Sequence, residues 1–248
     1  MADPAARLVD QVRPPVPIRQ WVLSLPFAVR YRLADDGRLM SAVLGVFLRL
    51  LSSWYRRQAR AQGHPHGQTG AVTFVPRFGS ALNRNPYLHV LMPDGVWVAG
   101  PAGEPPVFVA TPAPTDEQVR QVVEQVAQRL GRWWERRGLL SDTQVDPLAD
   151  RAPVLAAITG AALQGTVSTG PRAGRPVRRL LADPASATRT GPLCLAARGC
   201  SLHAATHLVA RDPAGLERLG RYLTRPPLAT GRRQQLDPDR LALALRRL

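Results

Sequence analysis

The sequence predicts an α+β fold in which helices flank a mostly antiparallel central sheet. Strand and helix patterns do not alternate regularly, the two central strands are joined as a hairpin, and the glycine motifs of parallel nucleotide-binding folds are absent. The 248 residues, 45% of them hydrophobic, are enough to build a real core. We expect a lead-in at 1–17, one domain at 18–230 and an incomplete C-terminal extension at 231–248.

The first half of the chain carries a strand, a long helix and a pair of strands. Residues 18–25 alternate as a strand does, and apolar residues recur at helical spacing from Leu39 to Arg60. The basic end of this helix, residues 55–60, suits the helix dipole and is not by itself a DNA site. Strands are expected at 72–74 and 87–92.

Tyr87 and His89 project from the same face of the second strand of this pair, because alternate residues of a strand share a face. Leu88 and Val90 lie on the opposite face. Taken alone, this stretch is most simply a half-buried strand with one satisfied histidine. Residues 93–95 are expected to form a turn.

The middle of the chain predicts a hairpin, two helices and a loop. The hairpin is expected at 96–99 and 107–110, and Thr115 with Gln118 forms a capping box that starts a helix ending at Gly138. A short apolar helix is expected at 154–166. The basic glycine-rich loop at 170–179 is either a backbone-phosphate contact or an ordinary solvated loop.

The last third predicts one strand and two helices. Residues 200–210 alternate as a strand whose one face holds His203 and His207, about 13 Å apart, so the two cannot share a metal ion. A helix starts at Pro213 and places Tyr222 beside an apolar stripe. The tail, 236–248, is expected to be helical.

The charge of the chain is strongly one-sided. All 33 basic residues are arginine, the formal net charge is +15 and the pI is about 11.5. Such an excess points first to nucleic acid and second to an anionic membrane. Two cysteines provide neither a zinc ribbon nor a disulfide framework, and no signal peptide or membrane span is expected, so a reducing cytoplasmic setting fits.

Seven short motifs stand in the order in which one protein family carries them. They are RQWVLSLP at 19–26, GAVTFV at 70–75, RFGSALN at 77–83, HVL at 89–91 with DGV at 94–96, GPRAG at 170–174, SLHA at 201–204 and RYLTRPP at 221–227. Together they resemble the transposases of rolling-circle insertion elements, which are single-strand DNA endonucleases of the His-hydrophobic-His (HUH) type. The resemblance covers about residues 8–228.

The resemblance implies an HUH-endonuclease-like sheet over residues 18–230 and single-stranded DNA, the element ends, as the partner. It implies that a divalent cation, Mg²⁺ or Mn²⁺, polarises a phosphodiester. It also implies that a tyrosine on a helix attacks the phosphorus, which leaves a 5′-phosphotyrosine and a free 3′-hydroxyl.

Matched by position, the resemblance makes Tyr222 the nucleophile and His89 the second histidine of the metal-binding pair. His203 is the candidate third ligand, and Tyr87 stands where the family has its first histidine. The arginines expected to hold the DNA are Arg77, Arg84, Arg172, Arg175 and Arg225.

Three departures from the family pattern leave two hypotheses open. A phenol, with a pKa near 10, is a poor ligand for a hard cation, so Tyr87 should weaken metal binding. The cysteine-rich module expected before Leu8 and the family's continuation beyond Leu248 are absent, so we expect truncation at both ends. The chain is then either an active nickase or a decayed remnant that only binds nucleic acid. A third candidate function, a basic structural protein of a ribonucleoprotein, would leave the seven motifs unexplained.

Overall fold

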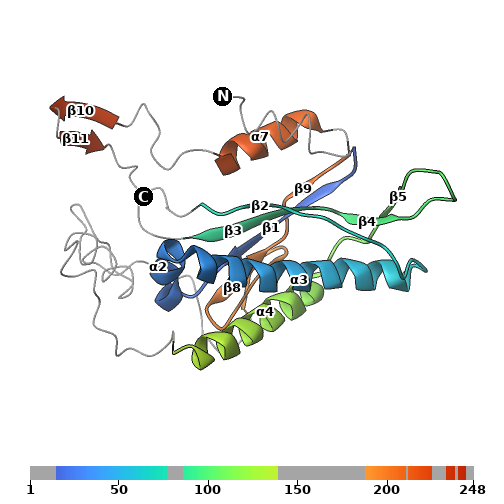
Figure 1. The fold of residues 1–248 in the computed structure, drawn as a ribbon, viewed down its shortest axis with the longest axis horizontal. Helices are drawn as coiled ribbons and strands as arrows, with labels where there is room; N and C mark the ends of the chain where they lie inside the picture. Colours follow the sequence, from blue (N-terminus) through green and yellow to red (C-terminus); the bar gives the residue numbers. More distant parts are fainter. Residues whose placement is uncertain are drawn as a thin grey trace.

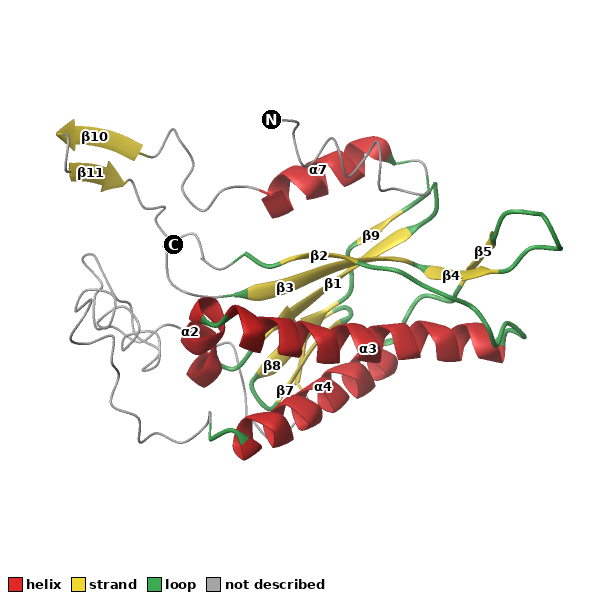
Figure 2. Ribbon diagram, viewed as in Figure 1, coloured by secondary structure: helices red, strands yellow, loops and turns green. Residues whose placement is uncertain are grey.

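The computed structural model describes residues 15–76, 86–138, 188–210, 212–224, 233–237 and 240–243 (Figures 1 and 2). Its helices are α2 (Phe27–Asp35), α3 (Gly37–Ala61), α4 (Asp116–Arg136) and α7 (Pro213–Thr224). Its strands are β1 (Ile18–Ser24), β2 (Val72–Phe74), β3 (Tyr87–Pro93), β4 (Gly95–Val98), β5 (Val107–Ala110), β6 (Thr188–Gly191), β7 (Cys194–Ala197), β8 (Cys200–His203), β9 (His207–Leu208), β10 (Arg233–Asp237) and β11 (Arg240–Leu243).

The central sheet has the strand order β2-β3-β1-β8-β7-β6, and β9 pairs with β1 beside β8. Every pairing in this sheet is antiparallel. Two smaller antiparallel pairs, β4 with β5 and β10 with β11, lie outside it. The predicted α+β fold with a mostly antiparallel sheet is therefore confirmed.

The two faces of the sheet are covered differently. Trp21 and Leu23 of β1 project to one face, where they are fully buried in a core shared with α3 and α4. We call this the core face. The other face, which we call the site face, carries Val22 and Ser24, both half-buried. Figure 2 shows α3 and α4 on one side of the sheet and α7 on the other.

Helices α4 and α7 begin where the sequence predicts, and α3 begins at Gly37, two residues before its predicted start. At the start of α4, the Thr115 hydroxyl accepts a hydrogen bond from the backbone N–H of Gln118. The side-chain oxygen of Gln118 in turn accepts from the backbone N–H of Thr115, which completes the capping box. At the start of α3, Asp36 caps the first turn by accepting from Arg38 and Leu39. Among the described residues, no helix is long and apolar enough to span a membrane.

The predicted continuous strand at 200–210 is wrong. Residues 204–206 interrupt it, and β8 and β9 pair with different parts of β1. The interruption is held by hydrogen bonds from Ala204 N to Leu193 O and from Gln20 N to Thr206 O. As a result His203 lies opposite Val22 and His207 lies opposite Arg19, so the two histidines occupy opposite faces instead of one.

The predicted helical tail is also wrong over its described part, which forms the hairpin of β10 and β11. Residues 241–243, Leu-Ala-Leu, have the period of two that suits a strand. At 93–95 the chain bends once at Asp94 and enters β4, which pairs with β5, so these residues do not close a hairpin. The predicted helix at 154–166 and loop at 170–179 lie outside the described residues.

Three short elements, α2, β6 and β7, were not predicted. Each has at most nine residues, too few for its apolar pattern to stand out. Strands β6 and β7 extend the sheet beyond β8, so the sheet is wider than the sequence indicates.

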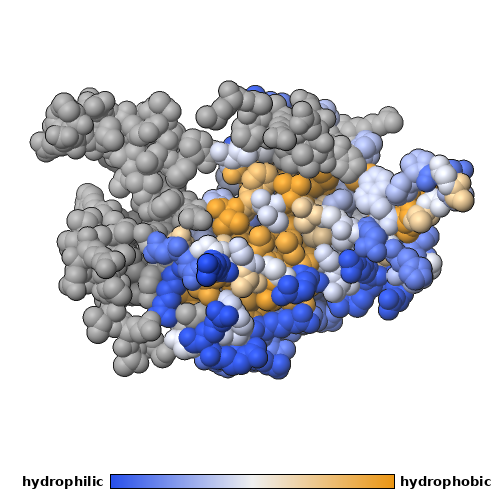
Figure 3. Space-filling model, in the orientation of Figure 1, coloured by the Kyte–Doolittle hydropathy of each residue, from blue (hydrophilic) through white to orange (hydrophobic). Residues whose placement is uncertain are grey.

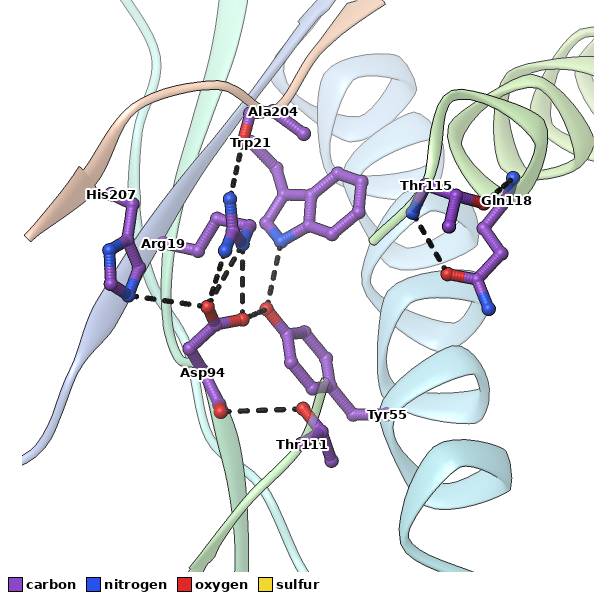
Figure 4. A network of polar contacts seen from close by, with 9 residues as sticks. All are labelled: Arg19, Trp21, Tyr55, Asp94, Thr111, Thr115, Gln118, Ala204 and His207. Carbon is purple, nitrogen blue, oxygen red and sulfur yellow. Dashed lines mark hydrogen bonds and ion pairs between the residues drawn. The ribbon is translucent and has the colours of Figure 1, made fainter. Parts of the chain in front are cut away.

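A buried ion pair ties the core face together (Figure 4). The Arg19 guanidinium on β1 donates to both Asp94 carboxylate oxygens, at 2.6–3.1 Å, and also to Ala204 O at 2.9 Å. The Tyr55 hydroxyl on α3 donates to Asp94 at 3.0 Å and accepts from the Trp21 indole at 3.1 Å. The pair thus joins β1, the β3–β4 junction and α3.

We expect Asp94→Ala to lower the free energy of unfolding by about 3–5 kcal/mol, because it leaves the Arg19 charge buried without its carboxylate. Urea denaturation followed by circular dichroism measures the loss. The double variant Arg19→Met/Asp94→Leu should lose less than Asp94→Ala, since it leaves no buried charge. His207→Ala should cost under about 1 kcal/mol, because the His207 side chain is 35% exposed and lies 3.4 Å from Asp94.

Candidate active site

The site face carries its polar side chains in two rows across neighbouring strands. In the first row His89 of β3 and His203 of β8 both pair with Val22 of β1, one from each side. In the second row Tyr87 and Ser201 both pair with Ser24. Residues directly opposite in an antiparallel pair share a face, so both rows face the same way.

Helix α7 packs on the neighbouring part of the site face through its leucines. Leu216 and Leu223 form a small buried cluster with Ile18 and Leu91, to which Val72, Phe74, Leu208 and Leu219 add partly buried contacts. This cluster is separate from the main core on the other face. Its packing holds α7 over the sheet beside the polar rows.

The packing of α7 brings Tyr222 next to His89. The two ring centroids are 6.3 Å apart with an interplanar angle of 76°. Tyr222 is nevertheless 66% exposed, while His89 is 7% exposed. The phenol therefore stands at the surface, above a buried imidazole.

Tyr87 completes an aromatic group with His89 and Tyr222. Its ring centroid lies 6.3 Å from that of His89, at an interplanar angle of 61°. Tyr87 is half-buried. The expected common orientation of Tyr87 and His89 is thus found in the structure, and three of the four predicted catalytic and metal residues lie together.

Burial controls the protonation of His89. Removal from water lowers the pKa of His89 to about 4, because the charged form loses its hydration. The imidazole is therefore neutral at pH 7, the form in which histidine ligates metals or accepts a hydrogen bond.

Gln20 is a site residue that the sequence analysis missed. Its side-chain amide nitrogen lies 2.9 Å from Nδ1 of His89, and both side chains are buried. An amide N–H here makes Nδ1 an acceptor, which puts the ring proton on Nε2. If the amide is turned over, its oxygen accepts from Nδ1 and the Nε2 lone pair is exposed. The alternation of residues 20–25 could have identified Gln20, because it places Gln20 on the same face as Val22 and Ser24.

The predicted metal ligands do not by themselves complete a cation site. His89 and His203 share a face but flank Val22, which places their Cα atoms about 10 Å apart, two strand spacings. Within the described residues, no group of three or more His, Cys, Asp or Glu side chains could hold a metal ion. The three-ligand centre implied by the resemblance is therefore not present among these donors.

The remaining candidates from the sequence are His207 and the five arginines expected to hold DNA. His207 lies near Asp94 on the core face, away from His89. The five arginines predicted to hold DNA lie outside the described residues; they are Arg77, Arg84, Arg172, Arg175 and Arg225.

Comparison with protein families identifies a match. A family model described as "Putative transposase" matches residues 70–247, more than half of the 248-residue chain. The matched span includes Tyr87, His89, His203 and Tyr222, whereas Gln20 precedes it. Comparison with curated proteins and with solved structures finds no match.

We expect His89 to make the fold less stable in acid. Its pKa is lower in the folded chain than the ordinary value of 6.5, so between pH 6.5 and pH 4 the unfolded state binds a proton that the folded state does not. The free energy of unfolding should fall over this window by at most about 3 kcal/mol from this residue. Urea denaturation at pH 7.0 and pH 4.5 measures the fall.

The matched control is His89→Gln, which cannot titrate in this range. The difference in stability between the two pH values should be smaller in this variant than in the unaltered chain. Equal differences would show that the His89 imidazole is not shielded from water.

Proposed function

Because the chain belongs to this family of transposases, we propose that it cuts and rejoins single-stranded DNA at the ends of a rolling-circle element. Tyr222 is the proposed nucleophile. The observation that carries this assignment is the placement of an exposed phenol on α7, directly beside His89 on the polar part of the sheet.

In the proposed reaction the Tyr222 oxygen attacks the phosphorus of one phosphodiester. The new bond joins this oxygen to phosphorus, and the bond from phosphorus to the 3′-oxygen breaks. The phenolic proton is released and the 3′-oxygen takes up a proton, which leaves a 5′-phosphotyrosine and a free 3′-hydroxyl. The reverse attack by a 3′-hydroxyl rejoins a strand and frees the tyrosine.

His89 is better suited to hold a phosphate oxygen or a cation than to act as the base. A phenol has an ordinary pKa near 10, while that of His89 is about 4. The transfer of a proton across about six pKa units costs about 8 kcal/mol, which is too much for an efficient general base. A neutral ring is instead available for ligation or hydrogen bonding at any pH above its pKa.

No step of the reaction is assigned to a metal ion, because the described residues do not complete a three-ligand site. A cation held by His89 and His203 would have to fill its coordination with phosphate oxygens and water. Mg²⁺ commonly binds to phosphate-bearing substrates in this way.

A second candidate function is DNA binding without cleavage. It is favoured by the lack of a three-ligand metal site among the described residues and by Tyr87, which stands where the family has its first histidine. The chain would then hold DNA through its arginines alone, and its binding would depend steeply on salt.

We expect Tyr222→Phe to abolish covalent capture of DNA while leaving the fold intact, because the lost hydroxyl is exposed and carries the proposed bond. The unaltered chain is incubated with a fluorescent single-stranded oligonucleotide of the element end, with Mg²⁺ or Mn²⁺, and resolved on a denaturing gel. Tyr31→Phe removes the hydroxyl of another tyrosine of the chain and serves as the control.

A covalent band in the unaltered chain and in Tyr31→Phe, and none in Tyr222→Phe, is the expected result. A band that persists in Tyr222→Phe assigns the nucleophile elsewhere. Salt-sensitive binding with no band in either metal favours the second candidate.

We expect Tyr87→His to raise Mn²⁺ affinity at least about tenfold, because it adds an imidazole on the same face as His89, two residues away. Isothermal titration calorimetry with MnCl₂ measures the change. Tyr87→Phe, which removes the hydroxyl and adds no ligand, is the control. If both variants bind Mn²⁺ alike, the cation does not bind at this end of β3.

A further inference from the structure

The solvent face of α3 carries a row of arginines that the proposed active site does not use. Arg38, Arg49, Arg56 and Arg60 are spaced so that they lie in one narrow line along the helix, and all four are exposed. Small residues fill the positions between them; these are Ala42, Gly45 and Ser53. We call these seven positions the arginine stripe. It runs from Arg38 to Arg60, 22 rises of 1.5 Å or about 33 Å.

Helix α3 differs from the neighbouring helix α4 in having no acidic residues. Helix α3 contains five arginines and no Asp or Glu, whereas α4 contains four arginines and four acidic residues. On α4, Arg120 pairs with Glu117 at 2.6 Å. Among the described residues, no ion pair involves an arginine of α3. A general preference for arginine in the chain would affect both helices equally, so it does not explain this difference.

The helix dipole explains only part of the stripe. Arg56 and Arg60 lie near the C-terminal end of α3, where a positive charge is favourable. Arg38 lies in the first turn, where the dipole opposes a positive charge, and Arg49 lies in the middle. These two arginines need another explanation.

The shape of the stripe suits a close approach by a negatively charged backbone. The Arg49 guanidinium folds back over Gly45, where an added Cβ would lie 3.2 Å from its Nη1. The small residues leave no bulky side chain between the guanidinium groups. Ser53 adds an exposed hydroxyl that can donate to a phosphate oxygen.

We propose that the arginine stripe binds the sugar-phosphate backbone of double-stranded DNA, on the side of the sheet opposite the cutting site. This inference rests on the proposed function for the presence of DNA. Four guanidinium groups along about 33 Å match a surface that carries one negative charge per about 1.7 Å of duplex axis. The stripe would hold the duplex that flanks the strand cut by Tyr222.

A duplex fits the stripe better than a single strand does. Single-strand surfaces combine positive charge with exposed aromatic rings on which bases stack. The aromatic side chains of α3 (Phe47, Trp54 and Tyr55) are buried in the core. The stripe therefore offers phosphate contacts without a stacking platform, which suits DNA whose bases are already paired.

A lipid surface fits the stripe less well. In the view of Figure 3 hydrophilic residues gather over the ends of α3 and α4, and the largely apolar surface lies between α7 and α3, away from those ends. A helix that lies in a membrane interface would instead bury large apolar residues beside its basic ones. The stripe itself holds only small residues between its arginines.

The test uses the triple variant Arg49→Gln/Arg56→Gln/Arg60→Gln of the 248-residue chain. Its binding to a 30-base-pair duplex is measured by fluorescence anisotropy over a series of NaCl concentrations. The matched control, Arg120→Gln/Arg129→Gln/Arg132→Gln, removes the same charge from α4. Circular dichroism checks that both variants are folded. Binding to anionic phosphatidylserine vesicles is measured in parallel.

We expect the α3 variant to lose affinity for the duplex on the order of a hundredfold at 0.1 M salt, with a salt slope smaller by about two to three. The α4 variant should lose much less. Equal losses in both variants, or no loss in the α3 variant, would overturn the inference. So would a loss of vesicle binding in the α3 variant with duplex binding unchanged.

Covalent capture of a short single strand by the unaltered chain is measured separately. Capture together with unchanged duplex binding in the α3 variant would refute the stripe alone. Duplex binding lost in the α3 variant, with no capture by the unaltered chain, would refute the cutting reaction and leave the stripe as a DNA contact.

Discussion

The register of β1 is the constraint on which the rest of the structure depends. This strand is hydrogen-bonded on one edge to β3 and on the other to β8 and β9. Its alternation therefore determines at once which residues of three other strands face the core and which face the candidate site. A shift of one residue would exchange the two faces and bury the polar rows against α3.

The buried pair of Arg19 and Asp94 opposes such a shift. Arg19 lies on the core face among apolar residues, and it is tolerated there because a carboxylate and a carbonyl satisfy its donors. Tyr55 adds a contact from α3, and burial, with the neighbouring carboxylate, raises the pKa of its phenol well above 10. The network thus ties strand register to the position of the covering helix.

The sheet separates two kinds of surface. On the core face, α3 and α4 bury the large apolar side chains and turn their charges to solvent. On the site face, a small apolar cluster holds α7 beside the buried His89 and the half-buried Tyr87, Ser201 and His203. In our proposals, chemistry on one strand of DNA takes place on the site face, while the flanking duplex is held by α3. The sheet between them would set the distance from the cutting site to the surface that holds the duplex.

Much of the fold follows from local patterns in the sequence. The helical spacing from Leu39 to Arg60, the capping box at Thr115 and the alternation at 18–25 each describe their element almost to the residue. The common face of Tyr87 and His89 follows in the same way, from the geometry of any strand. The transposase family was also evident from short ordered motifs, and the family match agrees with it.

What the sequence alone determined is therefore the type and order of the long elements, the excess of arginine, and the common face of Tyr87 and His89 on one strand. Only the tertiary structure decided that His203 and His207 fall on opposite faces, that Gln20 contacts His89 and that Tyr222 meets the same imidazole. These contacts join residues from 69 to 133 positions apart or depend on a break in a strand. Such relations arise from packing and sheet register, which local periodicity does not encode.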